Sequence, residues 1–158
     1  MFGNVPRVLG ARVSGSTLPR DRVLRGSAIE VGWWLVGTIS EREMVVMNMY
    51  ANSGSDPVGV YGSVELDLEW ANVQDQRARS VGWTLLGYLH KHPWGIEPSS
   101  TDQRMFERLA RGLKQDMLCL IAGEPEEGLL LPKLQAHIAV HGDGSFRPLE
   151  LIVEQEVS

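Results

Sequence analysis

Short apolar segments separated by glycine, proline and polar residues recur along the whole sequence, and this spacing constrains the fold more than any other feature. Segments of this length, bounded by turn residues, are typical of buried or half-buried β-strands. Longer segments with apolar residues three and four positions apart indicate helices. The expected strands are 7–13, 31–39, 44–50, 63–70, 83–89, 117–122, 133–140 and 146–153, and the expected helices are 19–26, 72–80 and 101–114.

The mixed order of these segments predicts an α+β fold, with helices flanking one curved mixed β-sheet as an α-β-α sandwich. The chain has 158 residues, a typical size for one domain. We therefore expect residues 1–158 to form a single domain. Its first part, 1–17, is expected to be an irregular lead-in because glycine and proline are frequent there.

Composition excludes several classes of function. With 20 acidic and 15 basic residues, the chain has a net charge of -5, which argues against nucleic acid as its main partner. The single cysteine, Cys119, excludes an internal disulfide and a cysteine-based zinc cluster, and its apolar surroundings indicate an inert buried thiol. No apolar stretch approaches the roughly 18 residues that span a bilayer, and the N-terminus lacks an apolar signal segment. We therefore expect no membrane association and a cytoplasmic location.

Two histidines, His90 and His92, follow a predicted strand one residue apart. Alternate residues of a strand point to the same face about 6.5–7 Å apart, so these two imidazoles can bind one metal ion. Ser99 and Asp102 then open the predicted helix, where the intervening loop can fold the carboxylate over the histidines. Two histidines and one aspartate leave the fourth position of a tetrahedral ion open, which is the arrangement of a catalytic zinc site.

Each of these elements also has a simpler interpretation. A His-x-His pair alone is weak evidence for a metal. Ser99-x-x-Asp102 ahead of an apolar helix is also a helix N-cap with an acid in the first turn, which the helix dipole favours without any function. His137 and His141 lie on a predicted strand, where a separation of four positions is about 13 Å, so we expect ordinary surface or turn histidines.

The combined pattern His90-Lys91-His92-Pro93 followed by Ser99-Ser-Thr-Asp102 resembles the JAMM motif of the JAB/MPN metalloprotease family. The upstream segment Glu30-Val-Gly-Trp-Trp-Leu-Val-Gly37 resembles the Glu-x-Gly-Gly-x-Leu-x-Gly segment of that family. Lys91 stands where the family usually has a small residue, and the loop before Asp102 is one residue shorter than usual. The resemblance implies a JAB/MPN-like (cytidine deaminase-like) α-β-α sandwich over residues 18 to 153.

The resemblance also implies a role for each residue of the motif. His90, His92 and Asp102 would bind Zn²⁺, which would lower the pKa of a bound water towards about 7. Glu30 would be catalytic, taking the proton of that water and passing it to the leaving amine. Ser99 would be catalytic by binding the oxyanion or orienting the water.

Three residues of this region also carry expectations from their positions. On its local sequence alone, Glu30 is more simply explained as an exposed acid at a strand edge, and the downstream motif is what favours a catalytic role. Trp94 follows His-Pro in the loop beside the proposed metal, so we expect it to line a substrate-binding groove. Lys91 should point to the face opposite the histidines, in a structural or solvated role.

By the same resemblance, the chain is expected to be a zinc metalloprotease of the isopeptidase type, similar to a deubiquitinase. Its substrate would be a ubiquitin-like protein, cut at the amide bond after the C-terminal tail. Compact prokaryotic members are associated with bacterial ubiquitin-like conjugation systems, including antiphage defence operons with E1-like and E2-like partners. Two alternatives remain open: a metal-free scaffold domain, and a hydrolase that processes a sulfur-carrier protein. The complete motif favours an enzyme, since scaffold members typically lack several of its residues.

Overall fold

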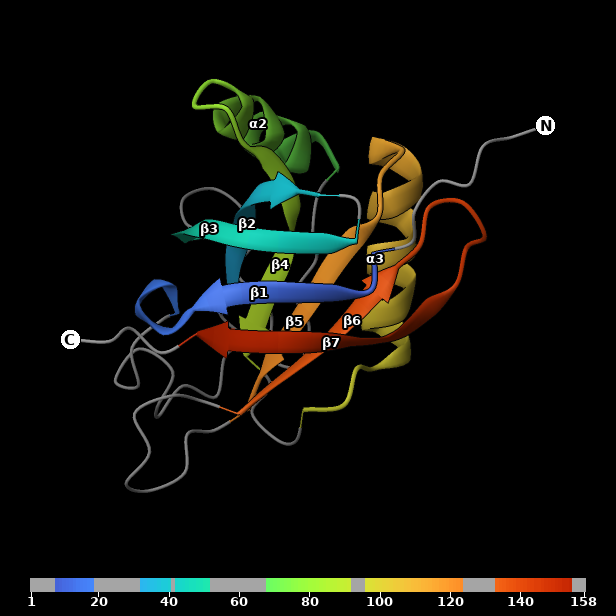
Figure 1. The fold of residues 1–158 in the computed structure, drawn as a ribbon. Helices are drawn as coiled ribbons and strands as arrows, with labels where there is room; N and C mark the ends of the chain where they lie inside the picture. Colours follow the sequence, from blue (N-terminus) through green and yellow to red (C-terminus); the bar gives the residue numbers. More distant parts are fainter. Residues whose placement is uncertain are drawn as a thin grey trace.

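The computed structural model describes residues 8–18, 32–40, 42–51, 68–91, 96–123 and 133–154. Within these ranges the chain forms seven strands, two α-helices and one short 3₁₀ helix (Figure 1). In chain order they are β1 (Gly10–Ser14), η1 (Gly15–Thr17), β2 (Gly32–Ile39), β3 (Glu43–Ala51), α2 (Leu68–Arg79), β4 (Thr84–Lys91), α3 (Ser100–Leu113), β5 (Met117–Ala122), β6 (Leu134–Ala139) and β7 (Phe146–Glu154).

The seven strands close into one barrel in the order β1-β3-β2-β4-β5-β6-β7. Strand β1 closes the ring because it pairs in parallel with β3 on one side and with β7 on the other. Strands β4 and β5 are also parallel, and α3 connects them. The remaining neighbours are antiparallel. Each strand therefore has one face inside the barrel and one face outside it.

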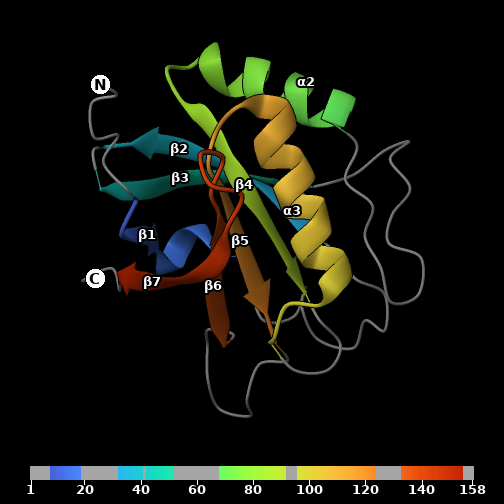
Figure 2. The same cartoon turned by 90° about the vertical axis from the view of Figure 1, so that its right-hand side faces the viewer.

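The expected α-β-α sandwich is wrong, because in the described part of the chain the sheet is closed on itself. A sandwich needs helices on both faces of an open sheet, whereas α2 and α3 here both pack on the outer face of the barrel (Figure 2). Closure of the barrel joins strands from opposite ends of the sequence. Arg12 on β1 and Glu154 on β7, for example, are separated by 142 positions. Local sequence patterns carry no signal for a pairing at that range.

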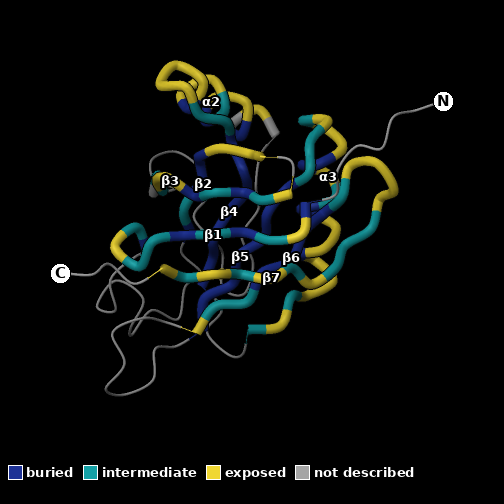
Figure 3. Tube along the Cα trace, viewed as in Figure 1, coloured by how far each residue is buried: buried dark blue, intermediate teal, exposed yellow. Residues whose placement is uncertain are grey.

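Buried residues are concentrated along the strands of the barrel (Figure 3). They form two apolar clusters, which correspond to the two sides of the barrel wall. One cluster fills the interior, with buried residues from β1 to β6 and partly buried ones from β7, among them Val13, Leu35, Leu86, Leu120 and Ile138. The other lies between the helices and the outer face of β2, β4, β5 and β6, and includes Trp34, Tyr88, Phe106, Leu109 and Cys119. The second cluster matters for the candidate site because it packs α3 against β5 and β6.

Most of the local predictions are confirmed. The expected strands 31–39, 44–50, 83–89 and 117–122 correspond to β2 to β5, the closing pair 133–140 and 146–153 corresponds to β6 and β7, and the helix 101–114 corresponds to α3. Strand β1 lies inside the expected irregular lead-in 1–17 and overlaps the expected strand 7–13. The expected helix 19–26 falls outside the described residues.

One local prediction is wrong in its described part. The alternation of apolar and acidic residues predicts a strand over 63–70, but the chain is already helical from Leu68, where α2 begins. Helix α2 buries Ala71, Gln74 and Ala78, whose spacing of three and four positions matches a helix face. In the part of the chain that the structure describes, neither helix is long and apolar enough to cross a membrane.

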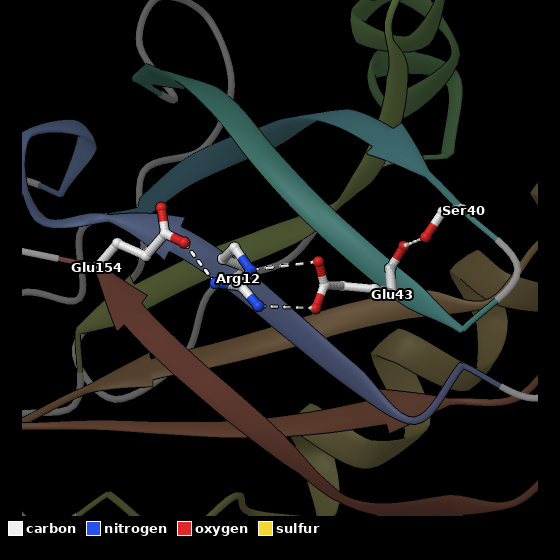
Figure 4. A network of polar contacts seen from close by, with 4 residues as sticks. All are labelled: Arg12, Ser40, Glu43 and Glu154. Atoms are coloured by element: carbon white, nitrogen blue, oxygen red, sulfur yellow. Dashed lines mark hydrogen bonds and ion pairs between the residues drawn. The ribbon is translucent and has the colours of Figure 1, made fainter.

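An ion-pair network crosses the closure of the barrel on its outer surface (Figure 4). Arg12 on β1 donates from Nε to Oε1 of Glu43 on β3 at 3.2 Å, and its Nη1 pairs with Glu154 on β7. The hydrogen bond to Glu154, followed by that to Glu43, raises the pKa of the Arg12 guanidinium. Ser40 donates its hydroxyl to the backbone carbonyl of Glu43. Exposed ion pairs of this kind contribute little to the stability of the fold. The backbone hydrogen bonds that β1 makes with β3 and β7 therefore contribute most to closing the barrel.

The close approach of β4 and β5 generates a stability prediction. A Cβ atom on Gly87 would lie 1.8 Å from the backbone oxygen of Leu118, its partner on β5. We expect Gly87→Ala to lower the free energy of unfolding by about 3 kcal/mol, because backbone must move to admit the methyl group. Urea denaturation measures this. The control is Gly142→Ala, where nothing lies within 4 Å, so its change should stay within about 0.5 kcal/mol. Equal midpoints for the two variants would contradict the prediction.

Candidate metal centre

His90 lies near the end of β4, a strand of the barrel wall that has β2 and β5 as its neighbours. It pairs with Gly32 of β2 on one side and with Ile121 of β5 on the other. Its side chain is fully buried, and its ring lies 6.3 Å from the rings of Tyr88 and Phe106, measured between centroids. Because Phe106 belongs to α3, the imidazole points out of the barrel and under that helix.

Asp102 lies in the first turn of α3, where a capping box holds it. The Ser99 hydroxyl oxygen accepts from the Asp102 backbone N–H at 3.1 Å. In return, the Ser99 backbone N–H donates to Asp102 Oδ2 at 2.8 Å. This reciprocal pair satisfies donors that every helix N-terminus leaves open. The N-cap interpretation of Ser-x-x-Asp is therefore confirmed.

The structure brings His90 and Asp102 together. His90 Nε2 lies 3.6 Å from Asp102 Oδ1, and the two side chains are 0% and 7% exposed. An N–H···O hydrogen bond normally spans about 2.7–3.2 Å, so this separation is too long for a good one. Two ligands of one tetrahedral zinc ion, with bonds of about 2.1 Å, are about 3.4 Å apart. The observed separation is therefore close to what a shared zinc ion requires.

The other predicted site residues divide into two groups. Ser99 is described and is the N-cap of α3, with an exposed side chain. Glu30, His92 and Trp94 lie outside the described residues. Within the described ranges, no group of three or more histidine, cysteine, aspartate or glutamate side chains could hold a metal ion. The described part of the chain thus supplies two of the three expected ligands.

Tyr88 and Gly32 belong to the surroundings of His90, and neither was predicted as a site residue. Tyr88 is 1% exposed and lies two positions before His90, so the two side chains share a face of β4. A Cβ atom on Gly32 would lie 2.1 Å from the Tyr88 hydroxyl oxygen, so glycine leaves the space that this ring occupies. Strand alternation could have identified Tyr88 as a neighbour of His90 from the sequence.

Two other residues near His90 are buried. Lys91 is fully buried at the end of β4, so a solvated role for it is wrong, and alternation along β4 directs it towards the barrel interior. Cys119 is also fully buried. Burial raises the pKa of its thiol well above the usual value, and the negative charge of Asp102 adds to that shift. The thiol therefore stays protonated, as expected for an inert cysteine.

His137 differs from its prediction, whereas His141 does not. His141 lies exposed in the turn between β6 and β7. His137 is only 5% exposed, and its ring stacks on Phe146 with centroids 5.2 Å apart and an interplanar angle of 5°. Burial lowers the pKa of His137 below the usual 6.5, and the nearby charge of Glu97 partly opposes that shift. A neutral imidazole is therefore favoured at this position.

The lowered pKa of His137 predicts how stability depends on pH. As the pH falls, the unfolded chain binds this proton before the folded chain does. The free energy of unfolding should therefore decrease from about pH 6.5 downwards to the folded-state pKa, and this group should have no effect above about pH 6.5. His137→Phe keeps an aromatic ring against Phe146 but cannot titrate. Guanidinium denaturation at about pH 7.5 and pH 5.5 should show a smaller loss in this variant. Equal losses in both proteins would contradict the assignment.

Comparisons with known proteins support the fold and leave the activity open. No family model and no curated protein matches the chain. The solution structure of protein DSY2949 from Desulfitobacterium hafniense matches with a TM-score of 0.66 and 20% sequence identity, over 94% of this chain and 95% of that one. In all, 139 chains of solved structures match. At this level of identity, the likeness to DSY2949 shows a common fold and nothing about chemistry.

Proposed function

We propose that this protein is a zinc-dependent isopeptidase whose metal is held by His90, His92 and Asp102. One observation carries the proposal: His90 Nε2 and Asp102 Oδ1, from a strand and a separate helix, lie 3.6 Å apart in a buried place. Fold class does not decide this chemistry, because catalytic sites depend on local geometry and the same chemistry recurs on unrelated folds. A zinc site at His90 and Asp102 is therefore compatible with a barrel as well as with a sandwich.

The residues around the imidazole suit a metal ligand. Zn²⁺ bound there would act as a Lewis acid towards a carbonyl oxygen and lower the pKa of a water. The rings of Tyr88 and Phe106 flank His90 and, with its complete burial, keep bulk water away from it. Electrostatic interactions gain strength where water is excluded. His92 would be the third ligand, since it follows His90 by two positions in the sequence.

Glu30 is the proposed general base. It precedes Gly32 by two positions in the sequence, and Gly32 pairs directly with His90. Consecutive Cα atoms are about 3.8 Å apart, and only two peptide units separate Glu30 from Gly32. Glu30 is therefore a short distance along the chain from the Gly32–His90 pair. In this role the Glu30 carboxylate accepts the proton of the attacking water and returns it to the leaving amine. Trp94 would contact the substrate beside the metal.

The proposed substrate is the C-terminal tail of a ubiquitin-like protein, cut at the amide bond that follows the tail. This part of the proposal rests on the resemblance of the His-x-His-Pro and Ser-x-x-Asp segments to the JAMM motif. The same resemblance suggests an enzyme of a bacterial conjugation or antiphage system, with E1-like and E2-like partners. The cytoplasm is its proposed location, from the single cysteine and the lack of an apolar signal segment in the sequence. An acidic chain of net charge -5 is consistent with a protein substrate and not with nucleic acid.

A metal-free scaffold domain is the second candidate, and one observation favours it. The capping box explains why Ser99 and Asp102 stand at the start of α3 without any metal. The buried histidine beside the aspartate would then be a structural pair. The two candidates differ in metal content, which can be measured directly.

Metal analysis of protein purified without chelators tests the proposal. We expect about one zinc per chain, as one catalytic site requires, and loss of zinc in His90→Ala and in Asp102→Asn. The second variant keeps an oxygen for the capping box but removes the charge. His141→Ala is the matched control, since His141 lies in an exposed turn away from the site. A folded wild-type protein without zinc would favour the scaffold. Full zinc content in both site variants would mean that the ion binds elsewhere and would contradict the proposed ligands.

Cleavage of a panel of ubiquitin-like fusions tests the activity itself. Wild-type protein should cut at least one fusion after the tail, and a chelator should abolish cutting until zinc is restored. Glu30→Gln should bind zinc normally but cut at least about 100-fold more slowly, the usual contribution of a general base. If Glu30→Gln cuts at the wild-type rate, the proton-transfer role of Glu30 is wrong.

A further inference from the structure

The two oxygens of Asp102 have different neighbours. Oδ2 accepts the Ser99 backbone N–H at 2.8 Å, whereas Oδ1 lies 3.6 Å from His90 Nε2. The carboxylate is therefore oriented by the helix N-terminus, and its second oxygen is the one directed at the imidazole. A ligand whose direction is fixed before the ion arrives binds more tightly, because less ordering has to accompany binding.

Two groups of Ser99, its hydroxyl and its backbone carbonyl, stabilise this orientation. Its backbone is extended, with φ -85° and ψ 166°, as an N-cap requires. Its hydroxyl oxygen accepts from the Asp102 backbone N–H at 3.1 Å, and its carbonyl oxygen accepts from the Gln103 backbone N–H at 3.0 Å. Loss of the hydroxyl would free the first turn of α3 to fray, and the Asp102 carboxylate would then lose its fixed direction.

We infer that Ser99 is a positioning residue for the metal: its capping box holds Asp102 in the conformation that binds zinc. The inference rests on the proposed zinc site and adds to it a coupling between zinc binding and the first turn of α3. Asp102 would hold the ion through Oδ1, the oxygen that faces His90. This positioning role of Ser99 is compatible with the expected catalytic contact of the Ser99 hydroxyl with substrate, because a hydroxyl can donate one hydrogen bond while it accepts another.

The size of the effect follows from the strength of an N-cap. Apparent affinity falls in proportion to the fraction of molecules that hold the competent conformation. Losing a serine N-cap changes the helix equilibrium by about 2-fold to 30-fold. Ser99→Ala should therefore weaken zinc binding by up to about 30-fold, with the largest effect if the competent conformation is only partly populated. Ser99→Asn should restore it, since asparagine is among the best N-caps and its side-chain oxygen accepts the same N–H.

Coupling of this kind is reciprocal, which gives a second readout. If the capping box favours zinc, then zinc must favour the capped first turn. Zinc should therefore slow hydrogen exchange at the backbone N–H groups of Asp102 and Gln103, which are the two that Ser99 accepts. This slowing should be present in the wild type and reduced in Ser99→Ala.

Competition between the protein and a coloured zinc chelator is the test, made well below the unfolding temperature. The matched control is Arg111→Gly, which weakens the exposed far end of the same helix but leaves the capping box intact. We expect weaker zinc binding in Ser99→Ala alone, with wild-type affinity in Ser99→Asn and Arg111→Gly. Equal zinc affinity in Ser99→Ala and wild type, or equal weakening in Arg111→Gly, would overturn the inference while the zinc site stands. No zinc binding by the wild type would overturn both.

If Ser99→Ala does not fold well enough for titration, Ser99→Asn and hydrogen exchange carry the test. Ser99→Asn lacks the hydroxyl, so wild-type zinc affinity in this variant supports positioning by the cap. Loss of zinc affinity in folded Ser99→Asn, or exchange at Asp102 and Gln103 that zinc leaves unchanged in the wild type, would contradict it.

Discussion

The packing of α3 on the outer face of the barrel is the contact on which the candidate site depends. Met105, Phe106 and Leu109 bury their side chains against the wall, and this apolar contact fixes the direction of the helix. The first turn of α3 then lies over the end of β4, where His90 emerges. The same Phe106 that anchors the helix also flanks the imidazole. Stability and the geometry of the site therefore come from one interface.

Barrel closure determines which face is available for that interface. Inward-facing side chains of all seven strands fill the interior, so helices can pack only outside. The outward-facing side chains of β2, β4, β5 and β6 form the surface that α2 and α3 cover. His90 faces this covered side, whereas Lys91 follows it on the opposite side of the strand. A shift of β4 by one residue would therefore exchange the faces on which His90 and Lys91 lie.

Much of this arrangement follows from local sequence, and the rest does not. The apolar stripe of α3 and the Ser99-x-x-Asp102 cap are local signals, so the helix and its start were predictable. The apolar segment 83–89 is also a local signal, and it predicted the strand that leads into His90. Closure of the barrel depends on β1 pairing with β7 across the whole chain, and the burial of His137 depends on its stack against Phe146. Both are tertiary contacts that no short pattern encodes. The start of α2 was missed because an alternating segment leads directly into a helix.

Diffraction from crystals grown with zinc, measured at the zinc absorption edge, tests the central claim most directly. The account predicts one anomalous peak about 2.1 Å from both His90 Nε2 and Asp102 Oδ1, with the Ser99 backbone N–H still bonded to the other Asp102 oxygen. A peak elsewhere on the chain, or none while these two side chains keep their present separation, would contradict it.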